Sequence, residues 1–129
     1  MIMNPGNLNK ITTIFFIIFS FSFSLQSKTI EGKIAKIQIL DKITAEVKTF
    51  EINVDNSLKF ESLDIQIYSC HKNPPDKIPE DYVLLKIFDE VNNENAQLIY
   101  QGWMISSSPA VTPLEHPIYD LWIKECKVK

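Results

Sequence analysis

The chain has 129 residues, enough for one domain, and its 45% hydrophobic and 22% charged residues are typical of a folded protein. All 13 basic residues are Lys, so the guanidinium that suits bidentate phosphate and base-edge contacts is absent. The net charge is −3 and the two signs alternate without a basic stripe, which argues against a nucleic-acid-binding protein.

An uncharged apolar run, 11–23, follows Lys10 near the N-terminus. This is the pattern of a secretory signal sequence, and the run is shorter than the ~20 apolar residues that span a bilayer as a helix. Ser22 and Ser24 are small residues at the positions that signal peptidase reads for a cut after Ser24. We therefore expect export across a membrane and no membrane span after cleavage, with an uncleaved anchor as the alternative.

The expected cleavage divides the chain into three parts. Residues 1–24 are predicted to be a signal peptide, 25–33 a flexible N-terminal segment and 34–129 a single β domain.

Two cysteines, Cys70 and Cys126, lie far apart in the sequence. In an oxidising compartment such a pair most simply forms a disulfide, worth about 4 kcal/mol on the chain-entropy model. The alternative is two buried free thiols. A metal or redox site is less favoured because the C-x-x-C spacing is missing.

Period-2 alternation at 35–39 and 43–47, on either side of Asp41-Lys42, predicts a β-hairpin. The apolar phase then changes from odd to even positions at 50–54. This change predicts a bulge near Lys48-Thr49 or a strand that crosses between faces.

Further along, four segments have strand patterns, and two proline-containing segments between them are expected to be irregular. The four strands are 63–70, 82–91, 97–105 and 118–126, and the irregular segments are 71–80 and 106–117. Segment 82–91 is apolar on both sides and is predicted to be central, while Gly102 predicts a bulge or a close backbone approach. Asn92 to Asn95 is predicted to be a polar turn.

No helical period of useful length follows the apolar run. We therefore predict an all-β domain, a small antiparallel sandwich or barrel of about six to seven strands.

Several uncommon residues toward the C-terminus occur in one order. They are Gly102-Trp103-Met104, Ser107 to Ala110, Leu114 to Pro117, Tyr119-Asp120, Trp122 and Cys126. With Leu40-Asp41-Lys42, Cys70 and Pro74-Pro75 upstream, the chain resembles the bacterial family of domain of unknown function 2155. The resemblance covers about 36–126 and implies a small exported alphaproteobacterial protein in the periplasm. It implies no activity, substrate or catalytic residue, and Lys stands where relatives often have Arg.

Two chemical sites are conceivable from the residue types. His116 and Asp120, with Ser107 or Ser108, would supply a small hydrolase of the Ser-His-Asp type, although no nucleophile-elbow motif accompanies them. Alternatively, His116 fixes the loop by donating a hydrogen bond to a backbone carbonyl or to Asp120, with the serines capping turns.

A metal site is the second conceivable chemistry. His71, Glu115, His116 and Asp120 are possible zinc ligands, but two histidines fall short of a persuasive set. No cofactor or metal is expected.

The leading hypothesis is a non-enzymatic module that binds an envelope protein or glycan through its aromatic, proline-rich loop. Trp and Tyr dominate interface hot spots, although they also fill cores, and a purely structural role for the loop stays open. The candidate binding residues are Trp103, Met104, Pro109, His116, Tyr119, Asp120 and Trp122.

Overall fold

The computed structural model describes residues 6–7, 10, 13–14, 28–91 and 95–129. Its strands are β1 (Ile30–Glu31), β2 (Ile34–Asp41), β3 (Glu46–Asn53), β4 (Ser57–Phe60), β5 (Leu63–Lys72), β6 (Asp81–Asp89), β7 (Gln97–Ile105) and β8 (Tyr119–Lys127). Most of the expected signal peptide, and most of the predicted turn after β6, lie outside the described residues. Among the residues that are described, no helix has the length and apolar character needed to cross a membrane.

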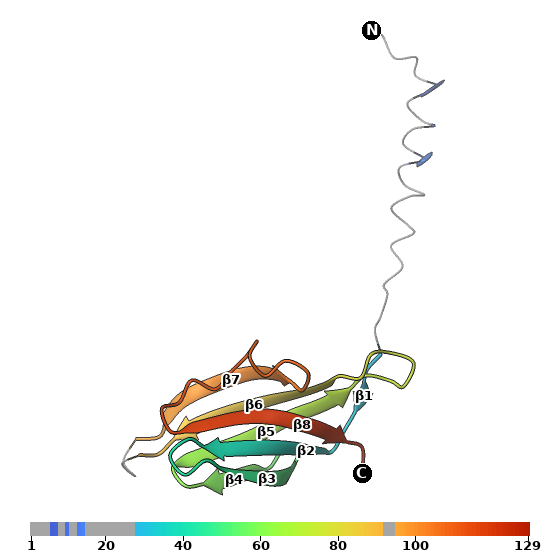
Figure 1. Ribbon diagram of the computed structural model, residues 1–129. Helices are drawn as coiled ribbons and strands as arrows, with labels where there is room; N and C mark the ends of the chain where they lie inside the picture. Colours follow the sequence, from blue (N-terminus) through green and yellow to red (C-terminus); the bar gives the residue numbers. More distant parts are fainter. Residues whose placement is uncertain (1–5, 8–9, 11–12, 15–27, 92–94) are drawn as a thin grey trace.

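The strands form two antiparallel sheets. Sheet A has the order β1-β5-β6-β7, with β4 also paired to β5, and sheet B has the order β3-β2-β8. In Figure 1 the red β8 and the teal β2 lie over β6 and β5, so the two sheets stack face to face. The sandwich is therefore the correct one of the two predicted architectures. The short strands β1 and β4 add to the six that alternation indicates.

The core lies between the sheets, where the alternating residues of the predicted strands meet. Odd-numbered residues of β2 and β6, such as Ile37 and Leu85, are fully buried, and so are Ile65 and Ile123 of β5 and β8. Burial of one such side chain contributes about 1.5–3 kcal/mol, so this row supplies much of the folding free energy. As predicted, β6 is central in its sheet, between β5 and β7.

The β2–β3 hairpin is confirmed, but the predicted bulge near Lys48-Thr49 is wrong. The pairing runs without a break from Ile34 opposite Asn53 to Asp41 opposite Glu46. The apparent phase change arises because residues 43–45 belong to the turn, where Ala45 has a φ of 59°. Val47 then points outward and Ile52 inward, as in any regular strand.

True bulges occur in β5 and β8, and they turn both cysteines into the core. Tyr68 has no partner opposite it in β6, and Lys124 has none in β2. Each extra residue shifts the side-chain alternation by one, so Cys70 and Cys126 point inward although they follow odd-numbered core residues. The two form a disulfide with a Cα–Cα distance of 5.8 Å, which confirms the predicted pairing. This bond joins sheet A to sheet B.

Residues 25–33 are predicted to be flexible, yet the described part of this segment contains β1, which pairs with the end of β5. Gly32 donates its N–H to the carbonyl of Cys70 at 2.8 Å, and Lys33 donates to Lys127 at 2.8 Å. A β-carbon on Gly32 would lie 2.2 Å from the sulfur of Cys126. Direct packing on the disulfide therefore orders a segment that has no apolar alternation of its own.

Of the two alternatives predicted for Gly102, a bulge or a close backbone approach, the bulge is wrong, because the bulge of β7 lies at Ile99. Ile99 has no partner between the pairs that Leu98 and Tyr100 make with β6. Gly102 has a φ of +155°, a conformation that L side chains rarely adopt, and the Tyr100 hydroxyl lies near the site of its missing β-carbon. The group that lies close to Gly102 is thus the side chain of Tyr100.

Candidate functional site

The outward-facing residues of the two sheets differ in character. Sheet B presents a mixed, largely polar row that includes Lys36, Thr49 and Glu125, as expected for a sheet face in water. Sheet A presents a cluster of apolar and aromatic side chains, none of them fully buried. They are Tyr68, Tyr82, Leu84, Phe88, Leu98, Trp103 and Ile105. A grouped apolar surface of this kind marks an interaction site more often than isolated exposed residues do.

One end of this face is hollowed. The described residues that line the hollow are Thr29, His71, Tyr82 and Trp103, and its volume is about 300 Å³. We call it the aromatic hollow. Trp103 is 45% exposed, so its ring is available to a partner. Adjacent strands supply three of these residues, because His71 pairs with Tyr82 across β5 and β6 and Trp103 lies one row away on β7.

The polar groups of the hollow form a chain through His71. Ser69 Oγ lies 2.9 Å from His71 Nε2, and Thr29 Oγ1 lies 3.4 Å from Nδ1. The imidazole is centred 5.8 Å from the Trp103 ring with a tilt of 50°. The Ser69 hydroxyl therefore holds the imidazole from one side, with the Thr29 hydroxyl close to its other nitrogen, and the imidazole contacts one side of the tryptophan.

Two of the candidate binding residues, Trp103 and Trp122, lie on opposite faces of the sandwich. Trp103 points outward from sheet A, whereas Trp122 points outward from sheet B and donates its indole N–H to Gln38 at 2.9 Å. Met104 is 3% exposed and Tyr119 8%, so both belong to the core. A single binding surface containing all four is ruled out by this geometry, and neither tryptophan is a core residue.

The other loop candidates surround a smaller hollow beside β8. Pro109, Asp120 and Trp122 line it together with Pro113, Leu114 and Leu121, and its volume is about 180 Å³. Asp120 is engaged in an ion pair with Lys42 at 3.0 Å. Leu114 is 4% exposed and packs into the core. The proline-rich loop thus packs beside β8 and contributes Leu114 to the core.

His116 is buried, and both of its ring nitrogens have hydrogen-bond partners. This is the loop-fixing role that the sequence indicates as an alternative to catalysis. Its Nδ1 accepts hydrogen bonds from the backbone N–H groups of Ile118 and Tyr119, each at 3.1 Å. Because Nδ1 accepts, the proton lies on Nε2, which donates to the Asp89 carboxylate at 3.1 Å. The partner carboxylate is Asp89 and not Asp120.

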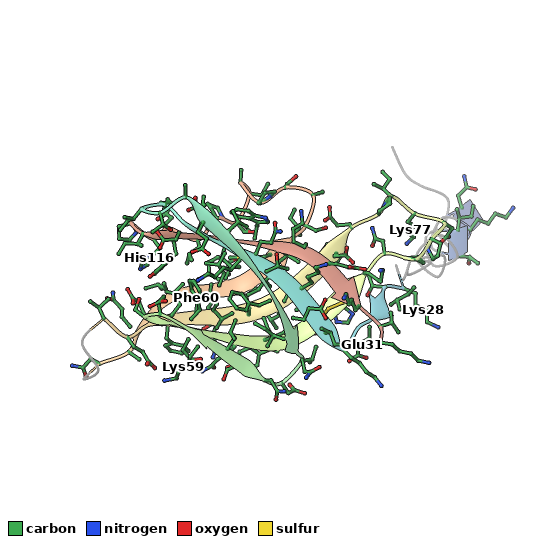
Figure 2. The ribbon with its side chains drawn as sticks, turned by 60° about the horizontal axis from the view of Figure 1, so that its bottom comes forward. Lys28, Glu31, Lys59, Phe60, Lys77 and His116 are labelled. Carbon is green, nitrogen blue, oxygen red and sulfur yellow. A yellow bond between two sulfur atoms is a disulfide. The ribbon has the colours of Figure 1, made fainter. Side chains whose placement is uncertain are left out.

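These contacts rule out the Ser-His-Asp arrangement. Ser107 donates its hydroxyl and its backbone N–H to Glu80, not to His116, and the Ser108 hydroxyl lies 3.5 Å from that of Ser107. Glu80 precedes the first residue of β6 and Asp89 is the last, so the two groups are separated by about 27 Å of strand. Figure 2 shows His116 at one end of the sandwich and Lys77, from the loop that contains Glu80, at the other.

The possible zinc ligands do not converge either. His71 lies near the start of β6 and His116 near its end. Within the part of the chain that the structure describes, no group of three or more His, Cys, Asp or Glu side chains could hold a metal ion.

Two neighbouring carboxyl groups, Glu80 and Asp81, are shifted in opposite directions. Burial alone would raise the pKa of Glu80, but hydrogen bonds from Ser107 and Ser106 outweigh it and hold this pKa below its ordinary value. Burial raises the pKa of Asp81 despite a hydrogen bond from the backbone of Cys126. Both groups fasten chain segments together at the end of the sandwich that carries the disulfide.

Tyr82 and Thr29 are absent from the residues that the sequence singles out for binding. A usable indication for Tyr82 is that 82–91 is apolar on both sides, which predicts a strand covered on both faces. In the structure the outward-facing side chains of Tyr82 and Leu84 are only partly buried. Thr29 reaches the hollow only because β1 is held on β5, a contact that local sequence does not reveal.

Fold and surface together define a small disulfide-linked β-sandwich with one open aromatic face. The chain belongs to the family described as "Uncharacterized protein conserved in bacteria (DUF2155)", whose model matches residues 35–126. An uncharacterised protein of Rickettsia prowazekii (strain Madrid E) is 34% identical over 91 residues, which are 70% of this chain and 59% of that protein. The match thus spans less than two thirds of the relative's length. No solved structure matches the chain.

Proposed function

We propose that this chain is an exported, non-enzymatic binding module of the bacterial cell envelope that holds its partner on the aromatic hollow of sheet A. The observation that carries the proposal is the 45% exposure of Trp103 over a hollow of about 300 Å³. Trp, Tyr and other large side chains contribute disproportionately to binding when a partner covers them.

Export is supported by the apolar run at 11–23 and by the buried disulfide, since stable disulfides accumulate in oxidising compartments. The mass of the protein purified from its native envelope tests this part. We expect a chain that lacks residues 1–24. An intact N-terminus in a soluble cytoplasmic fraction would contradict export.

A binding role fits better than a hydrolase because the polar groups of the loop are used internally. His116 is saturated by Asp89 and two backbone N–H groups. Ser106 and Ser107 are held by Glu80, and the Ser108 hydroxyl lies beside that of Ser107. Neither set leaves a base beside a free hydroxyl, which nucleophilic catalysis requires.

The test is site-specific photocrosslinking in the native envelope. A photoreactive residue at Gln101 lies on the outer face of β7 next to Trp103, and one at Thr49 lies on the outer face of sheet B as the matched control. We expect a discrete adduct from position 101, none from position 49, and loss of the adduct when Trp103→Ala is added. Adducts of equal yield from both positions, or an adduct that survives Trp103→Ala, would overturn the proposed surface.

Trp122→Ala is the matched variant for Trp103→Ala. It removes the same side chain from the opposite sheet, where the indole donates to Gln38. Both variants should fold, because both tryptophans face outward. Only the change at position 103 is expected to abolish the adduct.

A further inference from the structure

We propose that the aromatic hollow is a subsite for one uncharged sugar ring of an envelope glycan. This inference rests on the proposed function and names its ligand class. A sugar ring has apolar C–H faces and a rim of hydroxyl groups. A matching site needs an exposed aromatic face with hydrogen-bonding groups around it.

The aromatic component comes from three strands. Trp103 of β7, Tyr82 of β6 and His71 of β5 line the same hollow. The hollow is open and shallow enough to leave Trp103 45% exposed. A ring can therefore approach the indole from solvent, whereas an aliphatic side chain gains most from a pocket that encloses it.

The electrostatic character of the hollow matches a neutral ligand. None of the described residues that line it is Lys, Asp or Glu. A phosphate or an anionic lipid headgroup would call for cationic groups at this position. An uncharged ring with polar edges loses nothing by the absence of such groups.

The hydrogen-bonding component is the chain from Ser69 through His71 to Thr29. Ser69 holds His71 at 2.9 Å, while the 3.4 Å separation of Thr29 Oγ1 from the imidazole is long for a hydrogen bond. The Thr29 hydroxyl can thus turn to a sugar hydroxyl without giving up a strong bond. The imidazole, held from the other side, keeps its position beside Trp103 and so presents a preorganised surface.

Binding is tested by NMR with uncharged N-acetylglucosamine trimer as the probe, read at the two indole N–H signals. Trp122, on the opposite sheet and bonded to Gln38, is an internal control. We expect a saturable shift of the Trp103 signal alone. Thr29→Val, which keeps the shape and removes the hydroxyl, should weaken the affinity about fivefold to tenfold.

The competing occupant is an apolar peptide segment, so an uncharged Leu-Phe-Leu amide is titrated in parallel. A Trp103 shift with the peptide and none with the trimer would overturn the sugar subsite and leave the binding module intact. Equal shifts of both indoles would likewise overturn it. If neither probe acts while position 101 still yields its adduct, the ligand class is wrong and the proposed function stands. If that adduct is also missing, both proposals fall.

Discussion

Replacement of Gly32 by Ala places a methyl group where the structure has no room. The new β-carbon would lie 2.2 Å from the sulfur of Cys126, 2.9 Å from the carbonyl oxygen of Lys127 and 3.2 Å from the sulfur of Cys70. Both cysteines are fully buried and covalently linked, and the carbonyl belongs to the last residue of β8. None of these atoms is the free end of a flexible side chain, so the backbone near β1 must move.

Overpacking of this kind costs about 1–3 kcal/mol. For a domain of this size, the melting temperature should fall by roughly 5–20 °C. Thermal unfolding followed by circular dichroism measures the change. Displacement of β1 should also expose the disulfide, so dithiothreitol should reduce Gly32→Ala faster than the parent protein under native conditions.

A double-mutant cycle identifies the cause. In a background with Cys70→Ala and Cys126→Ala the sulfur clashes disappear, so Gly32→Ala should cost at least 1 kcal/mol less than in the parent. If the cysteine-free background is unfolded, the reduction rates decide instead. An equal loss of unfolding free energy in both backgrounds would refute the proposed packing on the disulfide. So would an unchanged rate of disulfide reduction together with a melting temperature that falls by less than about 1 °C.

The remaining predictions concern buried polar groups. His116→Ala should lower the free energy of unfolding by about 2–3 kcal/mol in urea titrations, because Asp89 and two N–H groups lose their partner. His116→Asn should cost less if its side-chain oxygen accepts from the same amides; an equal loss would contradict that role. Asp81→Asn should raise the melting temperature more at about pH 7 than at about pH 3, since a raised pKa means that stability falls as pH rises from the unfolded-state pKa through the folded one. A gain independent of pH would contradict burial as the cause. Iodoacetamide should label neither cysteine without reductant, as both are 0% exposed and bonded; mass spectrometry that finds labelled Cys70 would refute the bond.

The strands, turns and disulfide could be predicted from local patterns. Alternation placed β2, β5, β6, β7 and β8 within a few residues of their observed ends. Apolar and polar residues alternate in these strands because one face of each strand is buried between the sheets. Every second position must therefore carry an apolar side chain. The cysteine pairing followed because the two residues had no other partner.

The candidate site was only partly readable. Trp103 was named from its residue type, but its supposed neighbours Met104, Tyr119 and Trp122 lie in the core or on the opposite sheet. Sequence separation does not tell which face of which sheet a residue occupies. His71 was considered only as a metal ligand, and the structure places it against Trp103 instead.

The sequence by itself determined the secondary structure, the all-β class and the family. The tertiary structure alone decided which aromatic residues share a surface. Bulges at Tyr68 and Lys124 reverse the side-chain alternation, and no local pattern marks them because only the facing strand reveals the unpaired residue. Likewise, whether the outer side of β6 is covered depends on packing between distant segments. The aromatic hollow lies on the face of sheet A opposite the three strands of sheet B, where Trp103 stays 45% exposed.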